Sequence, residues 1–115
     1  MTMENTKEVT AMTDQATLDV GQVVRHRLFD YRGVICDVDP VFMHSEEWYD
    51  QMAKTQPPKD EPWYRVLVHD SPMETYVAQR NLEPDESHEP VNHPEVAHYF
   101  MDFDGQRYRL AQRIN

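Results

Sequence analysis

Four basic residues gather near the start of the chain, where they could bind phosphate. Arg25, His26 and Arg27 are consecutive, and Arg32 follows a few residues later. Arginine suits phosphate because its planar guanidinium group donates two parallel hydrogen bonds. On a β-strand, Arg25 and Arg27 would point to the same side, since successive side chains alternate. These four residues, which we call the arginine strip, are a candidate DNA- or phosphate-binding site.

Acidic residues close to the arginine strip offer a second interpretation. Asp30, Asp37 and Asp39 are near enough in sequence to pair with its arginines across a hairpin, and exposed pairs of this kind are common and weakly stabilising. Asp37 and Asp39 could also act as paired carboxylates or as ligands of a hard metal. However, the chain has no glycine-rich phosphate loop and no HExxH motif. We therefore expect no catalytic residues and no enzyme activity.

Four large aromatic residues in the middle of the chain are candidates for a protein interface. Trp48 and Tyr49 are adjacent, as are Trp63 and Tyr64. Aromatic side chains dominate the energetics of interfaces and of cores alike. In a small domain most of them are expected to pack internally, and the remainder to form a subunit contact or a surface that binds client proteins.

The remaining metal-ligating residue types do not form a recognisable metal motif. His88, His93 and His98 are spaced by five, which suits neither the i, i+4 zinc pair of a helix nor a zinc finger. The single cysteine, Cys36, excludes a disulfide within the chain and a cysteine-based zinc site. Its apolar neighbours predict a buried, unreactive thiol. We expect no metal and no cofactor, and a reducing environment fits best.

The charge balance opposes tight binding to nucleic acid. The 115 residues include 11 Lys and Arg against 21 Asp and Glu, a formal net charge of −10 at pH 7. DNA-binding surfaces obtain much of their affinity by neutralising phosphates with Lys and Arg. No apolar run approaches the roughly 20 residues that span a bilayer, so we expect no insertion into a membrane.

A hairpin is the element that would position the arginine strip. Apolar and β-branched residues cluster before and after Gly33, which favours two paired strands. We expect the chain to reverse at Gly33, because glycine adopts a positive φ without steric cost. Asp39-Pro40 is predicted to end the second strand, since proline cannot donate to a ladder.

The aromatic residues fall on a predicted helix and on later strands. Ser45 is a candidate N-cap for a helix over residues 45–53, which has Glu46 and Glu47 in its first turn. Residues 63–68 and 74–78 are rich in aromatic and β-branched types and are predicted to be strands. Four or five short strands with one helical insertion predict a single, mainly β domain in the form of a small barrel.

Two flanking segments differ from this central region. Residues 1–17 lack periodic apolar spacing and are predicted to be a disordered N-terminal tail. Residues 84–115 are a C-terminal extension that begins with a polar linker. It continues with a short helix starting near Pro94, whose apolar stripe could dock on the barrel, and ends with an Asp-Gly turn and a hairpin or strand. The barrel domain then spans residues 18–83.

Four motifs in that domain resemble those of a known family. The segments are VGQVVRHRLFDYRGVI at 20–35, DVDP at 37–40, PWYRVLV at 62–68, and TYVA at 75–78 followed by Asn81-Leu82. Together they resemble the HspQ family, also called YccV-like or hemimethylated-DNA-binding domain proteins. The resemblance covers about residues 18–83, and the linked motifs are more specific than any one of them.

The resemblance implies a small SH3-like β-barrel with one or two short helices and no enzyme activity. It also implies a location in the bacterial cytoplasm and a homo-oligomer, with a trimer as the expected form. The family has two known roles, binding of hemimethylated DNA and a heat-shock role in protein quality control.

The acidity of the chain favours the second of these roles, because a protein of charge −10 repels phosphate but can engage basic or partly unfolded protein surfaces. We predict a non-catalytic heat-shock factor that binds proteins and promotes Lon-type proteolysis of selected or denatured clients. The alternative is a hemimethylated-DNA-binding protein that contacts phosphates through the arginine strip.

Overall fold

Short antiparallel strands make up most of the regular structure. The structure is a computed structural model that describes residues 15–111. Its elements, in chain order, are β1 (Val23–His26), β2 (Arg32–Asp39), α2 (Glu46–Met52), β3 (Trp63–Val68), β4 (Glu74–Ala78), the 3₁₀ turn η1 (Gln79–Asn81), β5 (Leu82–Pro84), α3 (Val96–Tyr99), β6 (Phe100–Phe103) and β7 (Tyr108–Leu110). The prediction of a mainly β fold with short helices is confirmed.

Only the end of the predicted N-terminal tail is described. Residues 1–14 lie outside the described residues, whereas Gln15 and Thr17 are hydrogen-bonded to the side chain of Gln79. The Nε2 atom of Gln79 donates to the carbonyl of Gln15 at 2.8 Å, and its Oε1 atom accepts from the N–H of Thr17 at 2.9 Å.

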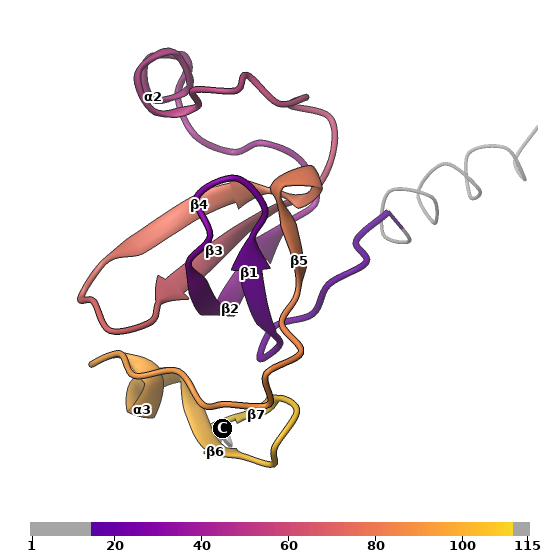
Figure 1. The fold of residues 1–115 in the computed structure, drawn as a ribbon. Coiled ribbons are helices and arrows are strands. Elements are labelled where there is room, and N and C mark those ends of the chain that lie inside the picture. Colours follow the sequence, from indigo (N-terminus) through magenta and orange to yellow (C-terminus); the bar gives the residue numbers. More distant parts are fainter. Residues whose placement is uncertain (1–14, 112–115) are drawn as a thin grey trace, which may run out of the picture.

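Five strands form one curved sheet in the order β4-β3-β2-β1-β5, and β6 pairs with β7 in a separate hairpin (Figure 1). Within residues 15–111, β4 and β5 are the sheet edges and no hydrogen-bond ladder joins them, so the predicted closed barrel is not confirmed. The two edge strands are consecutive in the chain, and only the three residues of η1 connect them. Where a closed barrel would have a backbone ladder along β4, the β1–β2 turn makes a side-chain contact, with 2.7 Å between the hydroxyls of Tyr31 and Thr75.

The β1–β2 hairpin forms as predicted, but its glycine has another role. The reversal occurs before Gly33, at Asp30, which has a φ of 59°. Gly33 lies inside β2, opposite Val24 on β1 and Val68 on β3. A Cβ atom at this position would lie 2.5 Å from the carbonyl oxygen of Leu67. The prediction of a positive φ at Gly33 was wrong, because the close approach of β3 is what requires glycine.

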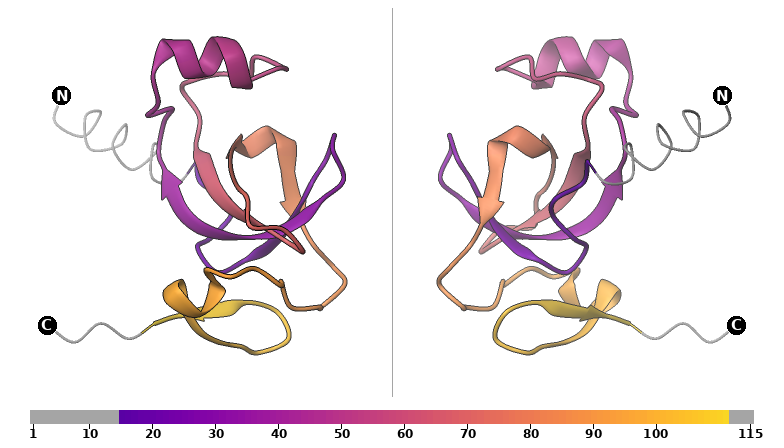
Figure 2. Two further views of the ribbon diagram at one scale, coloured as in Figure 1. Left: turned by 90° about the vertical axis from the view of Figure 1, so that its left-hand side faces the viewer. Right: turned by 90° about the vertical axis from the view of Figure 1, so that its right-hand side faces the viewer.

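Both faces of the sheet are covered, which explains why β2 and β3 are buried along much of their length. One face carries a core that includes Val24, Ile35, Tyr64 and Val66. The opposite face carries a second core of Val23, Val34, Cys36, Leu67, Val91, Phe100 and Tyr108. The last three of these residues come from the C-terminal extension, which lies against this face (Figure 2).

The C-terminal extension contains the predicted short helix and hairpin. Helix α3 follows Pro94, and the ring of His93 accepts the N–H of Glu95 at 3.0 Å in place of a conventional N-cap. The β6–β7 turn contains Gly105 with a φ of +96°. The extension is joined to the sheet by Tyr108, whose N–H donates to the carbonyl of Gly21 at 2.7 Å.

Helix α2 lies at the opposite end of the sheet from the extension (Figure 2). It begins as predicted after Ser45, whose hydroxyl accepts the N–H of Trp48 at 3.1 Å. The proline-rich segment that follows is fixed by aromatic side chains. Tyr49 donates to the carbonyl of Pro57 at 2.7 Å, and the indole of Trp63 donates to that of Pro58 at 3.1 Å. None of the helices in residues 15–111 has the length and apolar composition needed to cross a bilayer.

Candidate functional site

Two members of the arginine strip lie at the surface, and each is paired with an acid. Arg25 is 2.7 Å from the carboxylate of Asp30 in the β1–β2 turn. Arg27 donates to the carbonyl of Leu82 and is 3.4 Å from the carboxylate of Glu83 on β5. Both arginine side chains remain about half exposed. The sequence predicted the Asp30 pair but missed Glu83, because β5 becomes a neighbour of β1 only through the sheet topology.

Arg32 is held in a more buried network. Its Nε atom is 3.1 Å from the carboxylate of Asp85, and its terminal nitrogen donates to the carbonyl of Glu89 at 2.6 Å. The Asp85 side chain is only 1% exposed. Burial alone would raise the pKa of this carboxyl, but the hydrogen bonds from Ser87 and Arg32 outweigh it and hold the pKa below its ordinary value. Arg32 therefore fixes the start of the C-terminal extension to the sheet.

His26, the histidine of the strip, points to the opposite side of the strand from Arg25 and Arg27. Its side chain is buried, with 4% exposed. Its Nδ1 atom accepts the backbone N–H groups of Leu28 and Phe29, at 3.1 and 3.0 Å. Burial lowers the pKa of His26, so the ring is neutral at pH 7 and acts as an acceptor. This side chain stabilises the turn and carries no charge for phosphate.

The two candidate carboxylates on β2 are occupied by structural partners. Asp37 lies 3.7 Å from Arg65, and Asp39 accepts the hydroxyl of Tyr76 at 2.6 Å. Within the described part of the chain, no three His, Cys, Asp or Glu side chains come together as a metal site. The single thiol, Cys36, lies at the bulge in β2 and is 7% exposed, as its apolar neighbours predicted.

Three of the four predicted interface aromatics come together in one cluster. Trp48, Tyr49 and Trp63 gather at the end of the sheet under α2, where Trp63 is 1% exposed and the other two are half-buried. Three residues that sequence reasoning missed complete the group. We use the name aromatic cluster for Phe42, His44, Trp48, Tyr49, Trp63 and Tyr76.

The rings of the aromatic cluster are in direct contact. Trp63 stacks on Tyr76, with 5.2 Å between the ring centroids, and meets Phe42 edge-on at 4.9 Å. His44 bridges the outer rings, because it stacks on Trp48 at 5.0 Å and meets the edge of Tyr76 at 4.2 Å. In the sequence, the residue types of Phe42, His44 and Tyr76 were the only signal that they belong to an aromatic cluster. The three positions as a set follow neither the helical nor the strand periodicity.

The fourth predicted interface residue, Tyr64, is not part of this cluster. Its side chain points to the opposite face of β3, as strand alternation requires, and is fully buried in the first core. Its hydroxyl accepts the N–H of Leu18 at 3.3 Å and contacts the amide oxygen of Gln79 at 2.5 Å. Tyr64 therefore fixes the start of the described chain to η1.

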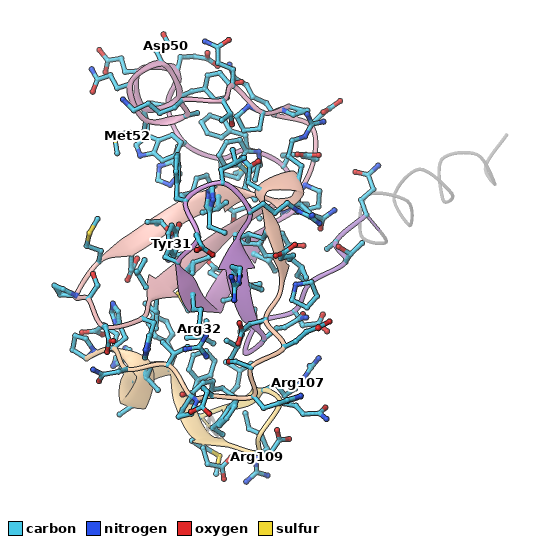
Figure 3. The ribbon with its side chains drawn as sticks, in the orientation of Figure 1. Tyr31, Arg32, Asp50, Met52, Arg107 and Arg109 are labelled. Carbon is cyan, nitrogen blue, oxygen red and sulfur yellow. The ribbon has the colours of Figure 1, made fainter. Side chains whose placement is uncertain are left out.

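A cavity of about 440 Å³ opens beside the aromatic cluster, along β4. Residues from several elements line it, among them Tyr31 on the β1–β2 hairpin, Trp48 and Met52 on α2, and Thr75 and Tyr76 on β4. Tyr31 and Met52 are labelled on either side of this region in Figure 3. The cavity has the volume and the mainly apolar, aromatic lining of a site that binds small ligands or peptide side chains.

Comparison with known protein families identifies the family to which the chain belongs. A family model described as "Hemimethylated DNA-binding protein YccV like" matches residues 16–107. The chain belongs to the YccV-like family. The match includes the β6–β7 turn, so the family's region extends into the C-terminal extension that packs on the sheet.

Curated relatives of this YccV-like chain include longer proteins. It is 35% identical to F-box only protein 21 of Homo sapiens over 107 residues, which cover 88% of this chain and 17% of that protein. It is 36% identical to F-box only protein 21 of Mus musculus over 91 residues, or 77% of this chain and 14% of the relative. The chain therefore spans less than a fifth of the length of these relatives.

Proposed function

We propose that this YccV-like protein is a non-catalytic factor that binds polypeptides and promotes the degradation of selected or denatured clients by a Lon-type protease. The observation that carries this proposal is the cavity beside the aromatic cluster. The proposal includes a cytoplasmic location, a homo-oligomer such as a trimer, and a curved sheet that is a variant of the SH3-like barrel.

The chemistry of the cavity supports a polypeptide ligand. Its walls offer aromatic rings and thioethers, which bind apolar side chains without demanding one shape. Several large apolar side chains around the opening are exposed: Phe29 is 62%, Met52 59% and Met73 60% accessible. Exposed apolar groups gathered at one place are typical of interaction sites.

The charges of the protein support the same choice over nucleic acid. The chain carries −10 overall. Each arginine of the strip is paired with an acid, and Arg32 is also committed to the backbone of Glu89. Phosphate contacts at these positions would have to displace carboxylates. Such binding is weak and falls steeply with salt.

Hemimethylated-DNA binding remains the second candidate function, because the family description names it. Arg25 and Arg27 are the strip residues that support this alternative, since their side chains are 44% and 53% exposed. The other two strip residues have structural roles, because Arg32 pairs with the buried Asp85 and His26 accepts hydrogen bonds in the β1–β2 turn.

A degradation assay tests the proposed function. A Lon-type protease, a panel of unfolded clients and this protein are combined, and client loss is followed over time. We expect faster loss with the wild type and a large reduction of that effect in Met52→Ala, because Met52 lines the cavity and is 59% exposed. Met101→Ala is the matched control, because Met101 is 56% exposed but lies on β6 away from the cavity. No acceleration for any client would contradict the proposal.

A DNA titration tests the alternative. One duplex is prepared in unmethylated, hemimethylated and fully methylated forms and titrated at low and physiological salt. We expect binding that is absent or is lost with salt whatever the methylation. Binding that survives physiological salt and prefers the hemimethylated duplex would make DNA the ligand.

A further inference from the structure

We propose that the cavity binds an extended polypeptide segment that pairs with the open edge of β4 as an additional strand. This inference rests on the proposed polypeptide-binding function and specifies how the ligand is held. β4 is an edge strand of the sheet, and all five of its residues, 74–78, line the cavity. An edge strand presents unpaired backbone donors and acceptors that another chain can complete.

The hydrogen bonds between β3 and β4 identify which groups are available. The N–H of Val68 donates to the carbonyl of Met73, and the N–H of Gln79 donates to that of Pro62. In an antiparallel ladder, hydrogen-bonded and non-hydrogen-bonded pairs alternate. Glu74 and Tyr76, opposite Leu67 and Arg65, therefore belong to non-bonded pairs.

The backbone N–H and carbonyl groups of Glu74 and Tyr76 consequently point away from β3, toward the open edge. None of the described residues supplies a hydrogen-bond partner for these four groups. Their spacing of two residues is the spacing at which a neighbouring strand forms its ladder.

The edge runs between two walls, and this restricts the ligand to a single strand. On one side, the β1–β2 turn brings Phe29 and Tyr31 to the cavity; on the other, α2 brings Trp48 and Met52. Because side chains of an extended peptide alternate, one set would contact the aromatic cluster and the other the β1–β2 turn. A second copy of the protein would bring its own turn and helix to the same narrow edge.

Charge further restricts the occupant. The net charge of −10 opposes a second copy and a nucleic acid at this edge. The acidic and basic residues that line the cavity are of both signs, Lys54, Arg65 and Glu74, and Arg65 pairs with Glu74. We therefore assign the site to extended polypeptide segments with bulky apolar residues at alternate positions.

The two tryptophans of the protein provide a direct readout, because both belong to the aromatic cluster. The probe is a capped nine-residue peptide without tryptophan, in which leucine and threonine alternate between terminal lysines. Two further peptides carry N-methyl groups on alternate backbone amides, one on the odd and one on the even positions. Titration of the full chain should change its fluorescence with the parent peptide and with only one of the methylated peptides.

A pair of variants at Glu74 tests the same edge from the protein side. Glu74→Pro removes an outward-pointing N–H without removing a β3–β4 hydrogen bond, and Glu74→Thr keeps that N–H while removing the carboxylate. We expect peptide affinity to fall about tenfold in the proline variant relative to the threonine variant. Urea unfolding of both variants shows whether each is folded.

The outcomes separate this inference from the proposed function. Equal binding of both methylated peptides, or equal affinity of the two Glu74 variants, would overturn strand addition while leaving a polypeptide-binding site. No binding of any peptide would overturn both. Dimerisation through this edge, seen in sedimentation as a dimer lost in Glu74→Pro, would overturn the assignment in favour of a second copy.

Discussion

The hydroxyl of Tyr76 donates to the carboxylate of Asp39 at 2.6 Å, which ties the aromatic cluster on β4 to β2, two strands away. The same hydroxyl accepts the N–H of Met43 at 3.1 Å, so it also fixes the segment that leads to α2. Burial, and secondarily the bond to Asp39, raises the pKa of Tyr76 above its ordinary value. One phenol thus joins the sheet edge, the central strands and a wall of the cavity.

Replacing Tyr76 by phenylalanine should destabilise this end of the protein. The ring and its stacking on Trp63 remain, but Asp39 and the N–H of Met43 lose their partner. We expect the free energy of unfolding to fall by about 1–2 kcal/mol, the usual cost of an unpaired, partly buried polar group. Urea denaturation followed by tryptophan fluorescence measures it, and an unchanged midpoint would contradict the anchoring role.

Arg25 and Arg32, which lie opposite each other beside the turn of the β1–β2 hairpin, should differ in their effect on stability. Arg32→Ala leaves the buried Asp85 carboxylate without its cation and should cost about 2–4 kcal/mol. Arg25→Ala breaks an exposed pair and should cost less than about 1 kcal/mol. Thermal unfolding of both variants makes the comparison. Equal destabilisation would contradict the distinction between a structural and a surface arginine.

His26 should make stability depend on pH in mild acid. Burial holds its folded pKa below the ordinary value of 6.5, so the unfolded chain takes up a proton first as the pH falls. The contribution of this residue is fully present above about pH 6.5 and is lost as the pH falls through the folded pKa. His26→Asn keeps an acceptor for the turn but does not titrate. Unfolding measured at pH 7.5 and pH 5.5 should therefore show a larger decrease in the wild type than in the variant.

Cys36 should be unreactive until the protein unfolds. Burial, with a smaller effect from the charge of Glu74, raises the pKa of its thiol to about 12. Almost no thiolate is then present at pH 8, and the side chain is 7% exposed. A thiol-reactive probe should label the unfolded chain in urea quickly and the native protein at least a hundredfold more slowly. Rapid labelling of the native protein would place the thiol at the surface.

Local sequence features were sufficient for most elements of the fold. The predicted strands 63–68 and 74–78 match β3 and β4, and Ser45 caps α2, because alternation and capping depend on neighbours in the chain. The apolar stripe of the C-terminal helix correctly indicated docking on the sheet, since Val96, Tyr99 and Phe100 pack in the second core. The contributions of Val91 and Tyr108 to that core were not foreseen, because they depend on segments that pack back from a distance.

The candidate site was harder to predict, because its members meet only through tertiary structure. The partner of Arg32 is Asp85, which is 53 residues away in the sequence. Tyr76 joins Trp63 because β3 and β4 pair in one register, and Phe42 joins them through the segment before α2. The arginine strip was the most visible motif, yet its charges are balanced by acids that sequence proximity only partly revealed.

The bond between Gly21 and Tyr108 has a consequence for how the chain is made. Synthesis proceeds from the N-terminus, so Val23, Val34 and Leu67 leave the ribosome well before the residues that cover them. Until Tyr108 emerges, the nascent protein presents this apolar face to the solvent. β7, the last strand of residues 15–111, therefore completes the cover of this face, and a chain that has not yet reached it exposes apolar surface that is prone to aggregation.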